Sequence, residues 1–275
     1  MKRITLGRLA ISALVLAAPL SAANAADLEF KTPTPPPPVG SWTGFYVGLQ
    51  GGAGFGLTET AVTASQGIPS PPGIFNVYTP GAYAVNALDY VGLHGGGTAG
   101  FNWQTGPIVF GVEGDISGAD LDGADNCATD FTFGTPSPNQ VRCDTKLSAF
   151  GTVTGRLGMS SDRMLVYIKG GGAWAHFNQD VTAVNLVFGP GGTVADAASI
   201  ADNRLGYTVG TGIEYAVWNH WSAKVEYDFL GFGTKNLVFP LMGPNVINQG
   251  LTTVNVFAND RESVSVIRAG LNYRF

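Results

Sequence analysis

The chain has 275 residues, a formal net charge of −5 and 39 glycines, and only 13% of its residues are charged. Glycine is about twice as frequent, and charge about half as frequent, as in ordinary soluble domains. The acidic balance argues against nucleic acid as a partner, because a basic surface is what binds a phosphate backbone.

The first 25 residues have the three parts of a secretory signal peptide. The start "MKRITLGR" is basic, "LAISALVLAAPL" is apolar, and the small-x-small sequence "ANA" ends at residue 25. The apolar run is too short to cross a bilayer of about 30 Å as a helix. We therefore predict that residues 1–25 direct export by the Sec pathway and are then removed.

A proline-rich stretch, "KTPTPPPPVG", follows the predicted cleavage site. Four consecutive prolines favour polyproline II, which is a stiff and extended spacer. We interpret residues 26–40 as a linker and residues 41–275 as one domain.

The remaining sequence alternates apolar and polar residues, and glycines and turn residues interrupt the alternation. This pattern is typical of an all-β chain, and no further run of 18 apolar residues indicates a transmembrane helix. Eight strands are predicted, at 42–56, 89–103, 107–118, 146–158, 163–177, 204–217, 220–231 and 263–275.

Short and long connections alternate strictly between these strands. The short ones are at 104–106, 159–162 and 218–219, and the long ones at 57–88, 119–145, 178–203 and 232–262. In an up-and-down meander, all the short connections then lie at one end. Short periplasmic turns and long outer loops are typical of bacterial outer-membrane barrels. The prediction is an eight-stranded antiparallel up-and-down transmembrane β-barrel with short periplasmic turns and four long extracellular loops.

The aromatic residues indicate that the apolar face points outward into lipid. Alternation alone does not decide this, because a soluble barrel would place the same face inside. The aromatic residues of the apolar face fall at two levels, and Phe45 and Phe55 mark them on the first strand. Ten residues span about 33 Å of strand, which rises roughly 25 Å at a tilt of about 40°. This is the height of the apolar band of such barrels, which aromatic girdles flank on both sides.

Five motifs occur in the order that a known family has. These are "WTGFYVGLQGGAGFG", "GVEGDI", "GRLG", "GTGIEYAV" and "RAGLNYRF". Together they resemble the small alphaproteobacterial outer-membrane barrels of the OmpA-like superfamily, which include RopB and the major surface proteins of Brucella. The resemblance covers nearly all of 42–275 and implies the outer membrane of a Gram-negative cell. The loops are longer and more apolar than in that family, and no peptidoglycan-binding domain follows, so loop-borne functions are not carried over.

Charged residues are expected on the inner face of the barrel, where an eight-stranded lumen is just wide enough for side chains to fill. We predict an interlocked charge network rather than a catalytic set, because charges held out of water need partners. The alternative is a path for ions, and Lys169 joins the network only if Tyr167 also points inward. The predicted members are Glu113, Asp115, Lys146, Arg156, Glu214, Lys224, Glu226, Asp228, Arg268 and Arg274. The outward residues of the predicted strands 204–217 and 220–231 are odd-numbered in both, so the turn between them must hold an odd number of residues. A three-residue turn at 218–220 places Glu214 opposite Lys224.

The two cysteines, Cys127 and Cys143, both lie in the second long connection. After export they meet an oxidising compartment, so we predict a disulfide that stabilises the loop by about 3 kcal/mol. A metal site is the rival interpretation, but no cluster with zinc spacing accompanies the cysteines. The sequence offers no Ser-His-acid grouping either, so no enzymatic activity and no cofactor are expected.

The last strand alternates to its end, and Leu271, Tyr273 and Phe275 share the apolar face. We expect this strand to close the barrel against the first, because an open edge in lipid would leave backbone groups without partners. The terminal aromatic also resembles the signal that the barrel assembly machinery reads.

The expected function is a structural role in the envelope, with contacts to lipid and lipopolysaccharide and to a host or neighbouring cell through the loops. The alternative is a small diffusion pore. What the loops bind is left open.

Overall fold

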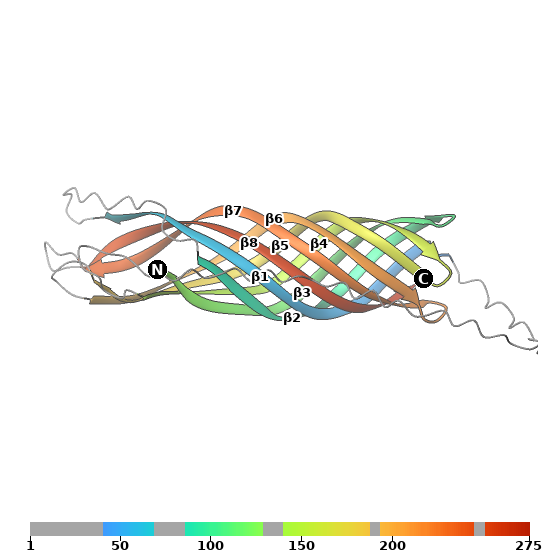
Figure 1. Ribbon diagram of the computed structural model, residues 1–275, viewed down its shortest axis with the longest axis horizontal. Helices are drawn as coiled ribbons and strands as arrows, with labels where there is room; N and C mark the ends of the chain where they lie inside the picture. The colour runs from blue at the N-terminus through green and yellow to red at the C-terminus, as the bar shows by residue number, and fades with distance from the viewer. Residues whose placement is uncertain (1–40, 69–85, 129–139, 188–192, 245–250) are drawn as a thin grey trace, which may run out of the picture. The chain divides into compact units, whose positions relative to one another are not determined.

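Eight antiparallel strands form a closed barrel in which each strand pairs with the next along the chain and β8 pairs with β1 (Figure 1). The computed structural model describes residues 41–68, 86–128, 140–187, 193–244 and 251–275, so the predicted signal peptide and linker lie outside the described residues. No helix among the described residues is long and apolar enough to cross a bilayer. The strands are β1 (Gly44–Ile68), β2 (Asn86–Thr105), β3 (Ile108–Ala128), β4 (Gln140–Ser161), β5 (Met164–Val187), β6 (Thr193–Ala216), β7 (Trp221–Pro244) and β8 (Leu251–Arg274).

The eight predicted strands are confirmed, but each predicted long connection contains a substantial length of strand, which is most of it in three of the four. The hairpins β1–β2, β3–β4, β5–β6 and β7–β8 continue well past the predicted boundaries, and their connections span only 69–85, 129–139, 188–192 and 245–250. Each predicted strand boundary lies where the alternation of apolar and polar residues ends, but this change in pattern does not mark the end of the strand. It marks instead the end of the outward apolar band, beyond which the backbone ladder continues with polar side chains.

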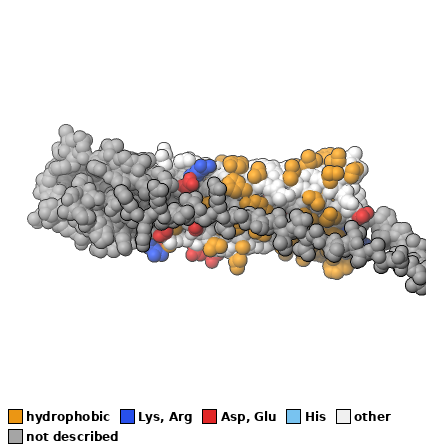
Figure 2. Space-filling model, in the orientation of Figure 1, with side chains coloured by type: hydrophobic (Ala, Val, Ile, Leu, Met, Phe, Trp, Pro, Cys, Tyr) orange, Lys and Arg blue, Asp and Glu red, His pale blue; other side chains and the backbone are white. Residues whose placement is uncertain are grey.

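The outward face carries the apolar residues. Leu49, Leu93, Val153 and Leu205 are among the large hydrophobic side chains that remain exposed on the barrel. Figure 2 shows hydrophobic side chains over the part of the visible face nearest the short turns, and most of the charged side chains toward the other end. An apolar outer band with a polar interior is the arrangement that lipid requires.

The short turns lie together at one end of the barrel. Gly106 has a φ of 59° between β2 and β3, and Asp162 has a φ of 51° between β4 and β5. In the turn between β6 and β7, the Val217 backbone N–H donates to the Trp221 carbonyl at 2.9 Å. The three-residue turn that parity predicts is therefore confirmed, and Glu214 lies opposite Lys224.

The close spacing of the strands accounts for much of the glycine content. A side chain at Gly96 would overlap the carbonyl oxygen of Ile116 on the neighbouring strand, whereas a Cβ at Gly97 would meet only the Gly48 carbonyl oxygen, at an ordinary 3.6 Å. Many other glycines resemble Gly96 in this respect. Glycine is needed at such positions because only a residue without Cβ lets the backbone approach this closely.

Strand β8 closes the barrel against β1, as expected. Tyr273 lies opposite Val47, and the Phe275 backbone N–H donates to the Phe45 carbonyl at 3.0 Å. The rings of Phe45 and Tyr273 lie 5.7 and 5.2 Å from the Phe275 ring, and Leu271 is exposed on the same face. The last residues of the chain thus form part of the outer aromatic girdle beside the short turns.

Candidate functional site in the barrel lumen

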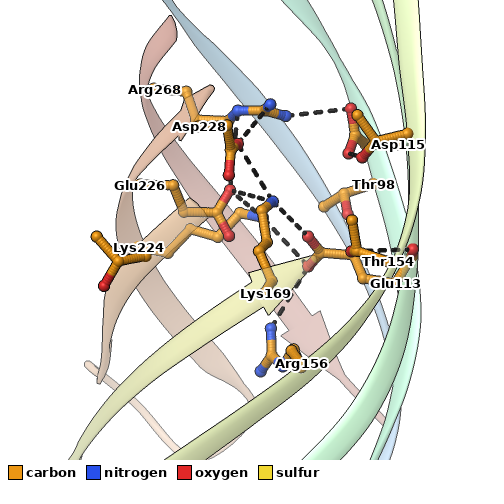
Figure 3. A network of polar contacts seen from close by, with 12 residues as sticks. Thr98, Glu113, Asp115, Thr154, Arg156, Lys169, Lys224, Glu226, Asp228 and Arg268 are labelled. Atoms are coloured by element: carbon orange, nitrogen blue, oxygen red, sulfur yellow. Dashed lines mark hydrogen bonds and ion pairs between the residues drawn. The ribbon is translucent and has the colours of Figure 1, made fainter. Parts of the chain in front are cut away.

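A set of buried charged side chains fills the middle of the lumen, and we call it the central network. It comes from β3, β4, β5, β6, β7 and β8, and each member is 7% exposed or less (Figure 3). Its members are Glu113, Asp115, Arg156, Lys169, Glu214, Lys224, Glu226, Asp228 and Arg268.

Glu113 lies at the centre of this network. Its carboxylate is 3.2 Å from Lys169 Nζ, 3.3 Å from Lys224 Nζ and 3.4 Å from Arg156 Nη1. It also accepts a hydrogen bond from the Tyr46 hydroxyl at 2.8 Å. One carboxylate thereby joins cations from three other strands, as Figure 3 shows.

Glu226 and Asp228 form the second half of the network. Glu226 lies 3.1 Å from Lys224 Nζ and 3.2 Å from Lys169 Nζ, and it accepts a hydrogen bond from the Tyr167 hydroxyl at 2.5 Å. Asp228 lies 2.6 Å from Arg268 Nη2 and 3.3 Å from Lys169 Nζ. Because Lys169 contacts both carboxylates and also Glu113, it ties the two halves together.

The remaining two carboxylates extend the network sideways. Asp115 pairs with Arg268 Nη1 at 3.1 Å and accepts a short hydrogen bond from Thr152. Glu214 pairs with Arg156 Nη2 at 3.1 Å. Glu214 lies opposite Lys224 in the register, but the ion pairs of Lys224 are with Glu113 and Glu226.

Two tyrosines hold the Arg156 guanidinium from either side. Its Cζ atom lies 5.0 Å from the centre of the Tyr46 ring and 4.6 Å from that of Tyr167. Both rings therefore make cation–π contacts while their hydroxyls donate to Glu113 and Glu226. Neither tyrosine is among the predicted members of the network, although Tyr167 lies two residues from Lys169 on β5, and this alternation was a signal that could have found it.

The charges of the central network are nearly balanced. Four cations face five carboxylates, a formal difference of −1. Removing a charge from water costs several kcal/mol, and only close partners with good geometry repay that cost. The contacts between these side chains connect six strands, and they alternate positive and negative groups instead of lining the lumen with charges of one sign.

The prediction that Lys146 belongs to this network is wrong. Its side chain is half-exposed and pairs with the exposed Asp120 at 2.6 Å on the outside of the barrel. The cause is a register irregularity between Leu147 and Ala149. Such a bulge adds one residue and reverses which parity faces inward.

Arg274 does face inward, but it lies apart from the central network. Its guanidinium carbon is 4.8 Å from the centre of the Trp42 ring. No ion pair of Arg274 is present within the described part of the chain. The side chain covers the ring at the short-turn end instead of joining the carboxylates.

Two apolar layers lie in the lumen with the charged groups. A small one near the short turns contains Trp42, Val109, Leu165, Tyr167 and Ala216. A larger one packs against the other end of the central network and we call it the apolar plug. Its members are Tyr90, Leu121, Leu147, Phe150, Ala173, Ala175, Phe177, Leu230, Phe232, Val264 and Val266.

A second polar group, the outer cluster, lies on the long-hairpin side of the apolar plug. It consists of Thr58, Tyr90, Gln179, Asp202, Arg204, Lys235, Asp260 and Glu262. Most of this cluster falls in segments that we expected to be loops. The alternation of Asp260, Glu262 and Val264 was a signal that β8 begins earlier.

The two cysteines lie on neighbouring strands. Cys143 is opposite Asp125 in the β3–β4 ladder, and a register irregularity follows at Asn126. Cys143 is disulfide-bonded, but the Cys127 side chain lies outside the described residues, so the predicted pairing stays a prediction. No cluster of three or more metal-binding side chains is present in the described part of the chain.

The fold and the lumen define a class of protein, the integral outer-membrane β-barrels. Residues 10–275 match the outer membrane protein beta-barrel domain family, and the chain belongs to that family. This confirms the family resemblance of the motifs and the location in the outer membrane.

The relatives of this chain are named as outer-membrane proteins, and the match to some of them covers nearly its whole length. It is 30% identical to the 31 kDa outer-membrane immunogenic protein of Brucella melitensis, over 93% of this chain and 94% of that protein. It is 27% identical to a 22 kDa outer membrane protein of Rhizobium leguminosarum, over 74% and 70% of the two chains. The outer membrane protease OmpT of Escherichia coli aligns over 84% of this chain and 97% of its own, with a TM-score of 0.43 and 11% identity. A likeness of that degree carries no argument about activity.

Proposed function

We propose that this protein is a non-enzymatic structural barrel of the outer membrane whose lumen does not conduct solutes. The observation that supports the proposal is the filling of the lumen by the central network and the apolar plug. Charged rings of one sign line the constrictions of many ion-selective channels, whereas here each carboxylate of the central network contacts at least one cation.

The outer rim supports a contact with lipopolysaccharide. Beyond the apolar band, Arg142, Lys146 and Arg261 are exposed on the outside of the barrel. Basic side chains at that level face the layer in which lipid phosphates lie, and such contacts are charge-assisted. The connections within the long hairpins, at 69–85, 129–139, 188–192 and 245–250, remain the proposed site for a host or neighbouring-cell ligand, and they lie outside the described residues.

Permeability of the cell envelope tests this proposal. In the native host, deletion of the gene should let bulky hydrophobic dyes and detergents enter faster, and should leave uptake of small hydrophilic solutes unchanged. Re-expression of the wild-type protein should restore the barrier. Slower uptake of small hydrophilic solutes in the deletion strain would contradict a structural role and support the diffusion pore.

A further inference from the structure

Among the described residues, one buried carboxylate of the outer cluster, Glu262, has only neutral hydrogen-bond donors. The Thr58 hydroxyl lies 2.9 and 2.8 Å from its two oxygens, the Tyr90 hydroxyl donates at 3.1 Å, and Gln179 Nε2 donates at 3.1 Å. Within the described residues, no cation forms an ion pair with Glu262. Its side chain is buried, at 1% exposure.

The cations of the outer cluster are engaged by the two aspartates. Arg204 Nε lies 2.9 Å from Asp202, and Arg204 Nη2 lies 2.5 Å from Asp260. Lys235 pairs with Asp202. Three carboxyl groups thus face two cations, and the cations are bonded to the other two carboxylates.

Gln179 connects the two neighbouring carboxyl groups of β8. Its single Nε2 atom donates to Asp260 at 2.8 Å and to Glu262 at 3.1 Å. Its Oε1 atom is buried and has no hydrogen-bond partner in the part of the chain that the structure describes. An amide turned the other way would present that oxygen to a protonated carboxyl group, which can donate.

The outer cluster lies at the outer edge of the lipid-facing band, where exposed apolar side chains such as Leu205 give way to charged ones. Outward neighbours of its residues on β2, β5 and β8 are the exposed Asp89, Asp180 and Arg261. Burial, and then the charge of Asp260, raise the pKa of Glu262 to about 8, against weaker opposing effects of Thr58, Arg204 and Tyr90.

We propose that Glu262, next to Asp260 on β8, holds a proton at the outer end of the lumen, and that losing this proton loosens the outer parts of β1 and β8. The groups on the strands packed against Glu262 determine how readily it keeps this proton. Tyr90 of β2, Asp202 and Arg204 of β6 and Lys235 of β7 are the other titratable or charged groups of the outer cluster. The outer end of the barrel is then pH-responsive, and the outer parts of β1 and β8 open less readily at acidic pH than at alkaline pH.

The direction of the effect follows from proton linkage. A carboxyl group whose pKa is raised by folding contributes its stability at low pH and loses it as pH rises from its ordinary value of 4.5 to about 8. An opening that releases Glu262 to water gives up this proton in that window. Its opening constant should therefore rise by about tenfold per pH unit.

Hydrogen–deuterium exchange of the full chain, folded in liposomes, tests this proposal. Between pH 5.5 and 7.5, after correction for intrinsic exchange, the opening constants at residues 57–59 and 259–263 should rise about a hundredfold in the wild type. Glu262→Gln should remove the slope. Glu59→Gln is the matched control, because Glu59 is an exposed carboxylate on the outer face of β1, opposite Arg261, and it should keep the slope. A flat wild-type profile, or an equal slope in Glu262→Gln, would overturn the proposal.

Infrared spectroscopy of the wild type provides a second measurement that needs no variant. The C=O stretching band of a protonated carboxyl group should be present at pH 6 and disappear with a midpoint near the pKa of about 8. If no such band is present at pH 6, Glu262 is ionised in the folded protein and the proposal is wrong.

Discussion

Single charged residues in the lumen show most clearly what the alternation of a strand can predict. Glu113, Arg156, Lys224 and Glu226 point inward, as their parity indicates. Lys146 points outward because a bulge lies between it and the rest of β4. A bulge of this kind depends on how the partner strand pairs, and a single strand's pattern does not contain that information.

Glu113→Gln should destabilise the folded barrel by about 3–5 kcal/mol, because three buried cations lose the charged partner that they share. Three cations contact that carboxylate, and their side chains and its own are fully buried or nearly so. Urea unfolding of the protein in liposomes, followed by tryptophan fluorescence, measures the change.

Lys146→Gln is the matched control for Glu113→Gln, since both changes replace a charged side chain by an uncharged one. The ion pair of Lys146 with Asp120 is solvent-exposed, and such pairs contribute little. An equal loss of stability in the two variants would mean that the central network does not brace the barrel.

At the scale of the strands, the sequence predicts how many strands there are, how they run and which of their faces points outward, but it predicts their lengths less well. The eight strands and their antiparallel order agree with the structure, because alternation, glycine and turn residues report local geometry. Their outer ends were missed because outside the lipid the apolar face is no longer required, and the ladder continues without that pattern. Asp202, Asp260 and Glu262 lie in these outer ends and are absent from the predicted lumen for this reason.

Adjacent glycines of β2 should respond very differently to alanine. Gly96→Ala should lower the folded fraction strongly, because its methyl group would overlap the Ile116 carbonyl oxygen, whereas Gly97→Ala meets no such obstacle. Refolding yields, read from the compact, fast-migrating band in unheated gel samples, provide the comparison. Equal yields would show that β2 and β3 can separate at little cost.

The hairpin of β3 and β4 should contain a disulfide between Cys127 and Cys143. Neither thiol should react with a maleimide in the folded or unfolded protein until a reductant is added. Cys143→Ser should then lower the stability by about 3 kcal/mol, the chain-entropy value for a ring of this size. Labelling of both cysteines without reduction, followed by mass spectrometry, would disprove the pairing.

At the scale of the whole molecule, the closing contact of β8 with β1 makes the end of the chain sensitive. Phe275 packs on Phe45 and Tyr273 beside the short turns, and we propose that it is also part of the assembly signal with Tyr273 and Leu271. Phe275→Asp should lower the folded, outer-membrane fraction in cells much more than Phe229→Ala does. Phe229 is the control because its ring lies in the other girdle, 6.2 Å from Tyr207. Equal folded fractions for the two variants would mean that Phe275 only contacts lipid and is not part of an assembly signal.

The sequence predicted the class of protein and its location, because the lipid-facing alternation and the aromatic girdles are imposed by the membrane itself. It did not predict that side chains fill the lumen in layers. Layering depends on which inward side chains of distant strands meet, such as Phe150 of β4 and Val266 of β8 in the apolar plug. These contacts exist only after the barrel has closed with a particular register.

Single-channel recording in planar lipid bilayers tests the closed lumen most directly. Purified, refolded wild-type protein should give no stable openings, and the charge reversals Glu226→Lys and Arg268→Glu should give no open state with a defined ion selectivity. Stable wild-type openings whose cation-to-anion selectivity changes when Glu226 or Arg268 is reversed would contradict a lumen closed by the central network, and would identify that network as the lining of a pore.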